Sequence, residues 1–178
     1  VSLVGEVARD KCILRSGATV GDGVWVTGEL GGSIAGHHLE FTPRLAEARW
    51  LAAHHQPSAM IDLSDGFAGD LGNLLAEANA GAELLESALP IRREARLRAR
   101  ESEAAKPPLL AALTDGEDYE LCFTLGQGRA VTLLDQFKQE FPGTPLSCVG
   151  KIVDRPGLKI RQKSGIMKIA TRGHVHFQ

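Results

Sequence analysis

The sequence has little of what several large classes of protein require. Its three cysteines, Cys12, Cys122 and Cys148, form no C-x-x-C pair, so we expect reduced thiols of a cytosolic protein. No apolar run approaches the roughly 20 residues of a membrane span, and the N-terminus has no secretory pattern. Lysine and arginine number 20 against 22 acids, so the net charge of −2 provides no general attraction for nucleic acid or for a membrane of anionic lipid.

Several catalytic signatures are also missing. The sequence has neither a G-x-x-x-x-G-K-[ST] loop nor a protein-kinase signature, so nucleotide binding would need carboxylates and Mg²⁺. The glycine-dense segment 28–36 lacks the spacing of a dinucleotide-binding loop and is expected to be a structural turn. Paired histidines at 37–38 and 54–55 have no cysteine at ligand spacing, which favours surface histidines. The arginine run 92–100 has no aromatic residue for stacking on bases, which favours a solvated helix face.

Two kinds of periodicity predict the fold. The chain is 43% hydrophobic, which is enough to bury a core. Apolar residues at helical spacing predict helices over 44–55, 66–80 and 130–141. Apolar or alternating segments predict strands at 1–8, 24–27, 58–63, 82–85, 118–124, 146–152, 157–162 and 165–169. We therefore expect one α+β domain, a mixed sheet with helices packed on it. Because residue 1 is valine, we also expect this chain to be a piece of a longer polypeptide.

An acidic turn follows the predicted strand 58–63. Asp62, Ser64 and Asp65 lie between that strand and the next helix. Capping of the helix by Ser64 or Asp65 would explain two of them. Asp62, placed between Ile61 and Leu63, would be buried and would need a partner. The alternative is a magnesium–phosphate site, because Mg²⁺ prefers one or two carboxylates together with substrate phosphates. The spacing leaves both interpretations open.

A second acidic turn precedes the predicted strand 118–124. Asp115, Glu117 and Asp118 surround a glycine, and Glu120 follows. Taken alone, the segment is typical of a solvated turn. Three acids so close together repel one another unless they are hydrated or share cations. Together with residues 62–65, they suggest an acidic pocket formed by two segments of the chain.

Three stretches together resemble a known family. They are "LRSGATVGDGVWVTGELGGSIAG", "AMIDLSDGFAGDLGNLL" and "GEDYELCF". The resemblance is to the C-terminal domain of the thiamine-monophosphate kinases, in the aminoimidazole-ribonucleotide synthetase superfamily, and it runs from about Gly5 to Phe177. The D-x-S-D-G turn is shared across that superfamily, whereas G-E-D-Y-E-L is more specific to the thiamine-phosphate kinases. The resemblance implies the fold of the superfamily's C-terminal domain.

The resemblance also implies an activity and a set of site residues. Members transfer the γ-phosphoryl group of ATP to thiamine monophosphate, assisted by Mg²⁺ and without a catalytic side chain. By position, Asp62 and Asp65 would bind magnesium, Arg15 and Ser64 would contact ATP, and Glu117 and His174 would contact thiamine monophosphate. In the family, an N-terminal domain supplies most of the magnesium ligands and much of the nucleotide pocket, and it builds a homodimer. Because that domain is absent from this chain, residues 1–178 alone are expected to be inactive.

Two positions depart from the family pattern, and they keep other functions open. Asp115 replaces the first of two glycines, and His174 stands where the family has another aromatic residue. A non-catalytic magnesium- or nucleotide-binding paralogue is therefore an alternative. Other superfamily members, such as selenophosphate synthetase or the hydrogenase-maturation protein, are less favoured because they lack the G-E-D-Y-E-L strand.

Overall fold

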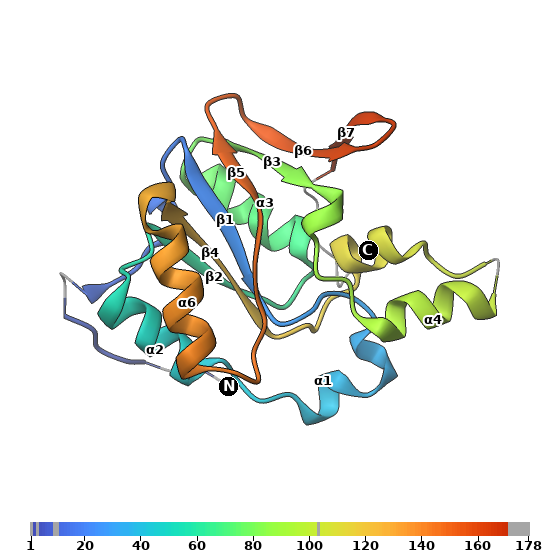
Figure 1. The fold of residues 1–178 in the computed structure, drawn as a ribbon, viewed down its shortest axis with the longest axis horizontal. Helices are drawn as coiled ribbons and strands as arrows, with labels where there is room; N and C mark the ends of the chain where they lie inside the picture. Colours follow the sequence, from blue (N-terminus) through green and yellow to red (C-terminus); the bar gives the residue numbers. More distant parts are fainter. Residues whose placement is uncertain (1, 3, 9–10, 103, 171–178) are drawn as a thin grey trace.

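The computed structural model describes residues 2, 4–8, 11–102 and 104–170, and one seven-stranded mixed sheet organises them (Figure 1). The strand order is β2-β4-β1-β5-β3-β6-β7. The strands are β1 (Asp22–Thr27), β2 (Ala59–Leu63), β3 (Gly81–Leu85), β4 (Glu120–Gly126), β5 (Leu146–Val153), β6 (Gly157–Gln162) and β7 (Gly165–Ile169). The helices are α1 (His37–Glu40), α2 (Leu45–His54), α3 (Phe67–Glu77), α4 (Arg93–Glu101), α5 (Pro108–Thr114) and α6 (Ala130–Glu140).

Helices cover both faces of one half of this sheet. Every residue of the central strand β1 is buried, and its side chains alternate between two cores. Val24 and Val26 pack in the core that contains residues of α3 and α5. Trp25 packs in a second core with residues of α2 and α6, which cross in front of the sheet (Figure 1). This three-layer arrangement confirms the expected mixed sheet with helices packed on it.

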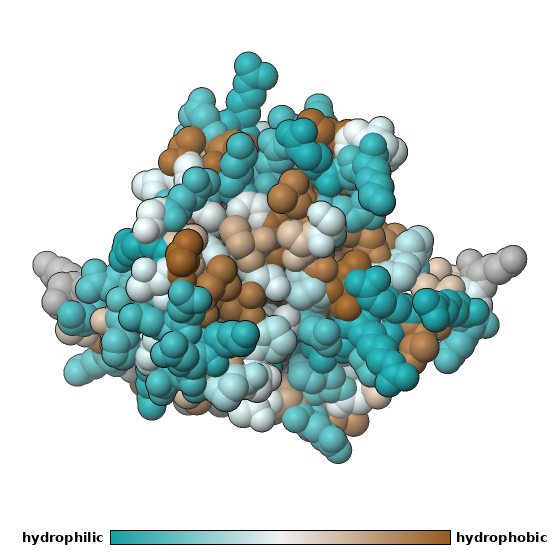
Figure 2. Space-filling model, viewed as in Figure 1, coloured by the Kyte–Doolittle hydropathy of each residue, from teal (hydrophilic) through white to brown (hydrophobic). Residues whose placement is uncertain are grey.

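The outer sides of the helices are solvated. Figure 2 shows hydrophilic side chains over α2, α4 and α6, with smaller hydrophobic areas between them. In α6, Leu133 and Phe137 are buried, whereas Leu134, which the helical spacing placed on the buried side, is 40% exposed. Within the described residues, no helix is long and apolar enough to cross a membrane.

Most of the predicted elements lie where expected, within a few residues. The prediction of a strand over residues 1–8 is wrong for those of its residues that the structure describes, since they form no strand. The arginine-rich segment forms α4, and only Ala95 of that helix is buried. A separate helix, α5, which the sequence analysis did not predict, starts at Pro108. Proline is well tolerated there because the first turn of a helix needs no amide hydrogen.

The glycine-dense segment 28–36 is a tight loop that contacts α4 and α5. Gly31 and Gly32 have φ values of +79° and +75°, which residues other than glycine rarely adopt. A Cβ atom on Gly31 would lie 2.6 Å from the amide nitrogen of Ala112, and one on Gly32 would lie 2.7 Å from that of Ala95. The glycines are therefore required by backbone packing, in agreement with the expected structural turn.

Candidate functional site

The two acidic turns lie side by side. The amide of Glu117 donates to the carbonyl of Ser64 over 2.8 Å, and the amide of Tyr119 donates to the carbonyl of Leu63 over the same distance. Gly116 makes this approach possible, because a Cβ atom there would lie 2.7 Å from the oxygen of Ser64. These contacts extend the antiparallel pairing of β2 and β4 beyond their ends. The expectation that the two segments form one pocket is confirmed.

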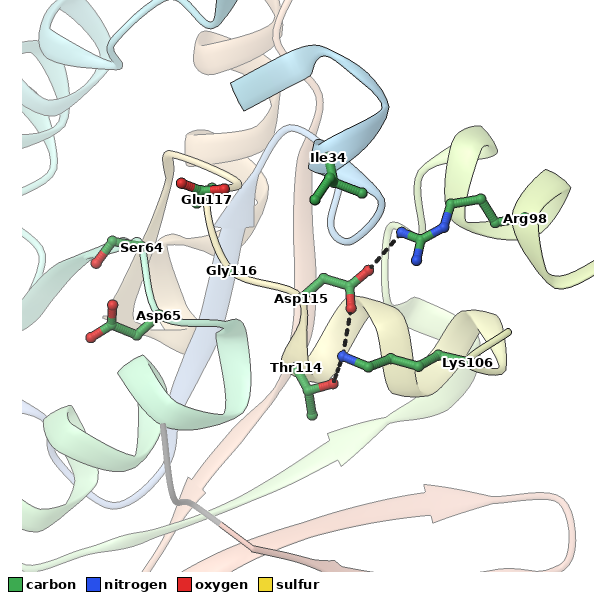
Figure 3. Close-up of a pocket in the computed structure, with 9 residues that line it drawn as sticks. All are labelled: Ile34, Ser64, Asp65, Arg98, Lys106, Thr114, Asp115, Gly116 and Glu117. Carbon is green, nitrogen blue, oxygen red and sulfur yellow. Dashed lines mark hydrogen bonds and ion pairs between the residues drawn. The ribbon is translucent and has the colours of Figure 1, made fainter. Parts of the chain in front are cut away.

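The pocket has a volume of about 340 Å³ and is lined by both acidic turns and by neighbouring helices. Ser64, Asp65 and Glu117 lie on one side of segment 114–117, while Arg98 and Lys106 approach from the other (Figure 3). Ile34, Thr114, Asp115 and Gly116 complete the lining. The pocket is therefore carboxylate-rich at one end and contains cations at the other.

Asp70, which the sequence analysis missed, holds the first acidic turn. Its Oδ2 atom accepts hydrogen bonds from the amides of Ser64 and Asp65, each over 3.0 Å. Burial raises the pKa of Asp70 to about 6, and the nearby charges of Asp65 and Asp62 add to the rise. The signal was present in the sequence, because an acid in the first turn of a helix is well placed to accept from amides before it.

The capping interpretation of Ser64 and Asp65 is wrong. Gly66 occupies the N-cap of α3, and no side chain caps that helix. Because Asp70 satisfies the amides of the turn, the side chains of Ser64 and Asp65 are not used to hold it. Neither side chain has a hydrogen-bond partner among the described residues, and both line the pocket. They are available to a ligand.

The expected burial of Asp62 is also wrong. Side chains alternate along β2, so Asp62 lies on the face opposite Ile61 and Leu63 and is exposed there. Strand β2 is the edge of the sheet, and Asp62 is near its last residue. An exposed carboxylate needs no protein partner. Its exposure leaves it accessible to a hydrated cation, and its charge is close enough to raise the pKa of Asp70.

The second turn contains two residues in a sparsely populated backbone conformation. Glu117 has φ of +64° and Tyr119 has φ of +52°. Such conformations in residues other than glycine are strained, and strained residues cluster at functional sites. The strain places the Glu117 side chain at the pocket (Figure 3), where it is exposed.

Asp118 joins the second turn to the glycine loop. It is 1% exposed, and its carboxylate accepts from the amide of Gly31 at 3.0 Å and from the hydroxyl of Ser33 at 2.8 Å. Burial raises the pKa of Asp118 to about 6, although these donors oppose the rise. These hydrogen bonds join residues that are more than 80 positions apart in the sequence. They fix the loop against the pocket.

Asp115 and Glu120 are both paired with cations. Lys106 Nζ lies 2.8 Å from Asp115 Oδ1, and Arg98 Nη1 lies 3.4 Å from Asp115 Oδ2 (Figure 3). Glu120 is buried and accepts two hydrogen bonds from Arg44, at 2.7 and 2.8 Å. Of the three acids in the turn, Asp115 is therefore neutralised by cations, while Glu117 is exposed to solvent and Asp118 is held by amide and hydroxyl donors. Asp115 adds no unbalanced negative charge to the pocket.

Arg15, another predicted site residue, does not line this pocket. Arg15 is exposed on a short 3-10 helix whose last residue, Gly17, packs against Ser58, just before β2 begins. It therefore lies near the opposite end of β2, a strand of five residues that spans about 17 Å. His174 lies outside the described residues.

The donor set around Asp62 and Asp65 fits Mg²⁺. In the described part of the chain, no three histidine, cysteine or acidic side chains converge as a metal centre would require. Mg²⁺ does not need such a cage, because it keeps several waters and usually takes one or two carboxylates together with substrate phosphates. Two accessible carboxylates and a hydroxyl on one turn meet that requirement.

Comparisons with known proteins agree on one family. No protein-family model matches the chain. The chain is 40% identical over 164 residues to the thiamine-monophosphate kinase of Rhodopirellula baltica, an alignment that covers 92% of this chain and 50% of that protein. The chain thus spans about half the length of the curated relatives it matches.

Solved structures agree with the sequence matches. The thiamine-monophosphate kinase of Stenotrophomonas maltophilia superposes with a TM-score of 0.72 at 28% identity, covering 86% of this chain and 54% of that one. AaThiL complexed with AMPPCP and TMP gives 0.65 at 28% identity, covering 93% and 54%. The hydrogenase-maturation protein HypE of Escherichia coli, at 19% identity and a TM-score of 0.72, shares the fold, with 94% and 53% covered.

Proposed function

Because the chain belongs to the thiamine-monophosphate kinase family, we propose that residues 1–178 form the C-terminal domain of a two-domain enzyme that phosphorylates thiamine monophosphate to thiamine diphosphate with ATP. The observation that carries the proposal is the pocket in which the Ser64–Asp65 turn meets Glu117. The relatives are about twice as long as this chain. We therefore assign the remaining ligands and the homodimer contact to an N-terminal domain.

Asp62 and Asp65 bind Mg²⁺ in this proposal, and Ser64 contacts the phosphates of ATP. The accessibility of both carboxylates supports these roles, as does the anchoring of the turn by Asp70. When bound, Mg²⁺ neutralises the charge of the phosphates and aligns them. The turn orients the side chains of Ser64 and Asp65 toward the ligand, because hydrogen bonds to Asp70 already fix its backbone. Phosphoryl transfer depends mostly on such positioning and on charge neutralisation.

Glu117 contacts the thiamine end of the substrate. The thiazolium ring of thiamine carries a positive charge, and a carboxylate exposed in the pocket attracts it. The strained backbone of Glu117 supports the proposal, since it keeps the side chain on the same side of segment 114–117 as Ser64 and Asp65 (Figure 3). The proposed contact of Arg15 with ATP and that of His174 with the substrate rest on the family resemblance alone. The chemistry uses soluble substrates, and we place it in the cytoplasm.

The experiment is a phosphoryl-transfer assay with ATP, Mg²⁺ and thiamine monophosphate. The full-length polypeptide is expected to form thiamine diphosphate, whereas the 178-residue chain alone is expected to be inactive. Glu117→Gln should raise the KM for thiamine monophosphate at least tenfold and leave the KM for ATP unchanged. Glu140→Gln, on α6 and away from the pocket, is the matched control. Product formation that does not respond to thiamine monophosphate would contradict the proposal.

A further inference from the structure

Ile34 is an exposed hydrophobic residue on a rigid part of the pocket wall. Its side chain is 68% exposed and lines the pocket. Other side chains of similar exposure, such as Leu39 on α1 at 77%, are absent from the lining. Scattered exposed hydrophobic residues are normal on a protein surface. An isoleucine that a fixed loop holds in a pocket whose other lining residues are polar, charged or glycine is a different observation.

The loop that carries Ile34 is held from both sides. Asp118 accepts from the amide of Gly31 and the hydroxyl of Ser33. Asp115 accepts from the amide of Gly32 at 3.2 Å and is itself paired with Arg98 and Lys106. The three residues before Ile34, which are Gly31, Gly32 and Ser33, are thus fixed by buried or half-buried carboxylates. A side chain on such a backbone contacts a ligand at a small cost in conformational entropy.

The order of the lining residues suggests what Ile34 contacts. Figure 3 shows Ser64 and Asp65 at one end of the pocket and Glu117 next to them. Ile34 lies beyond Glu117, above Gly116 and Asp115 and beside Arg98 (Figure 3). Thiamine monophosphate has the same order of chemical groups, with a phosphate at one end, a thiazolium ring in the middle and an aminopyrimidine ring at the other end. In the proposed function, Ser64 and Asp65 hold the ATP phosphates and Mg²⁺, which the substrate phosphate must approach for transfer, and Glu117 contacts the thiazolium ring.

We propose that Ile34 is a specificity-determining residue that packs against the aminopyrimidine ring of the substrate. This inference rests on the proposed function. Arg98, Asp115 and Lys106 are positioning residues. Their ion pairs fix Asp115, which holds the loop that carries Ile34, and they close the pocket at the end where Ile34 lies. Neutral, flat heterocycles gain affinity from apolar contact, and the loss of such a contact typically weakens binding by about tenfold.

The test uses the full-length polypeptide and two ligands. Binding of thiamine monophosphate, and of the phosphorylated thiazole half that lacks the pyrimidine, is measured by calorimetry with Mg²⁺. Ile34→Ala is expected to weaken binding of thiamine monophosphate by roughly tenfold and to leave binding of the thiazole half unchanged. The KM should rise by the same factor with little change in kcat. Ile34→Leu should retain affinity, and Leu39→Ala is the matched control.

The outcomes separate this inference from the proposed function. If the wild-type protein phosphorylates thiamine monophosphate and Ile34→Ala binds it normally, the role of Ile34 is refuted and the function stands. Equal losses for both ligands would also refute it, since they would indicate a structural effect of the substitution. If the wild-type protein neither binds nor phosphorylates thiamine monophosphate, both the function and this inference fail. Unchanged melting temperatures show that the variants are folded.

Discussion

Replacement of the buried Asp70 should make the protein more stable when the new side chain keeps the hydrogen bonds. Asp70 is 3% exposed and accepts from two amides. Its pKa of about 6 lies above the ordinary value of 3.8, so the folded state binds a proton more tightly than the unfolded state. The contribution of Asp70 to stability therefore falls as the pH rises from about 4 to about 6, and it stays low above pH 6.

The magnitude follows from that shift. One unit of pKa corresponds to about 1.4 kcal/mol, so ionised Asp70 costs on the order of 1–3 kcal/mol at pH 7. Asparagine has the same shape and a carbonyl oxygen that can accept from the amides of Ser64 and Asp65. Asp70→Asn should therefore raise the free energy of unfolding at pH 7 by about 1–3 kcal/mol. Asp70→Ala leaves both amides unpaired and should be about 2 kcal/mol less stable than Asp70→Asn.

The assay is urea unfolding of the purified chain and of both variants at pH 4 and pH 7. The advantage of Asp70→Asn over the wild type should be present at pH 7 and should largely disappear at pH 4, where Asp70 is protonated in the folded state. A variant that is less stable than the wild type at pH 7 would refute this reasoning. So would an advantage of the same size at both pH values, because it could not come from ionisation.

Three further predictions concern other residues of the site and its supports. Glu117→Gly should relieve the strain of φ = +64° and raise stability by roughly 1 kcal/mol, as urea unfolding would report, while raising the KM for thiamine monophosphate. Asp62→Asn and Asp65→Asn should shift the melting temperature by less than about 2 °C because neither side chain is buried, while the Mg²⁺ concentration for half-maximal activity of the full-length protein should increase. Arg44→Met leaves Glu120 buried without its partner and should cost about 3 kcal/mol in unfolding free energy, and adding Glu120→Gln should recover part of that loss.

The strands around the site could be predicted because their side-chain pattern is local. Alternating apolar and polar residues over 118–124 predicted β4, and the apolar run before Asp62 predicted β2. The exposure of Asp62 depends on the position of β2 at the edge of the sheet. Strand order is decided by contacts distant in sequence, so the burial of a single carboxylate could not be predicted from its two apolar neighbours.

The supports of the pocket were harder to predict than its acids. Asp118 bonds to a loop 85 residues or more away in sequence, and Asp115 pairs with Arg98 and Lys106 from a helix and a connection that show no strong apolar stripe. Helix α5, which begins at Pro108, was not predicted from the sequence. The acids could be recognised in the sequence because so many lie close together in two short segments. Their partners could not, because the tertiary fold brings them there from distant segments.

Anomalous diffraction is the most direct test of the claim that the Ser64–Asp65 turn binds a metal–nucleotide complex. Crystals of the full-length protein would be grown with Mn²⁺ in place of Mg²⁺, a non-hydrolysable ATP analogue and thiamine monophosphate. The account predicts an anomalous peak at roughly the 2.1 Å typical of Mg²⁺ ligands from a carboxylate oxygen of Asp65 or Asp62, with phosphate oxygens on the same ion. An occupied nucleotide site with no metal at either carboxylate would contradict it.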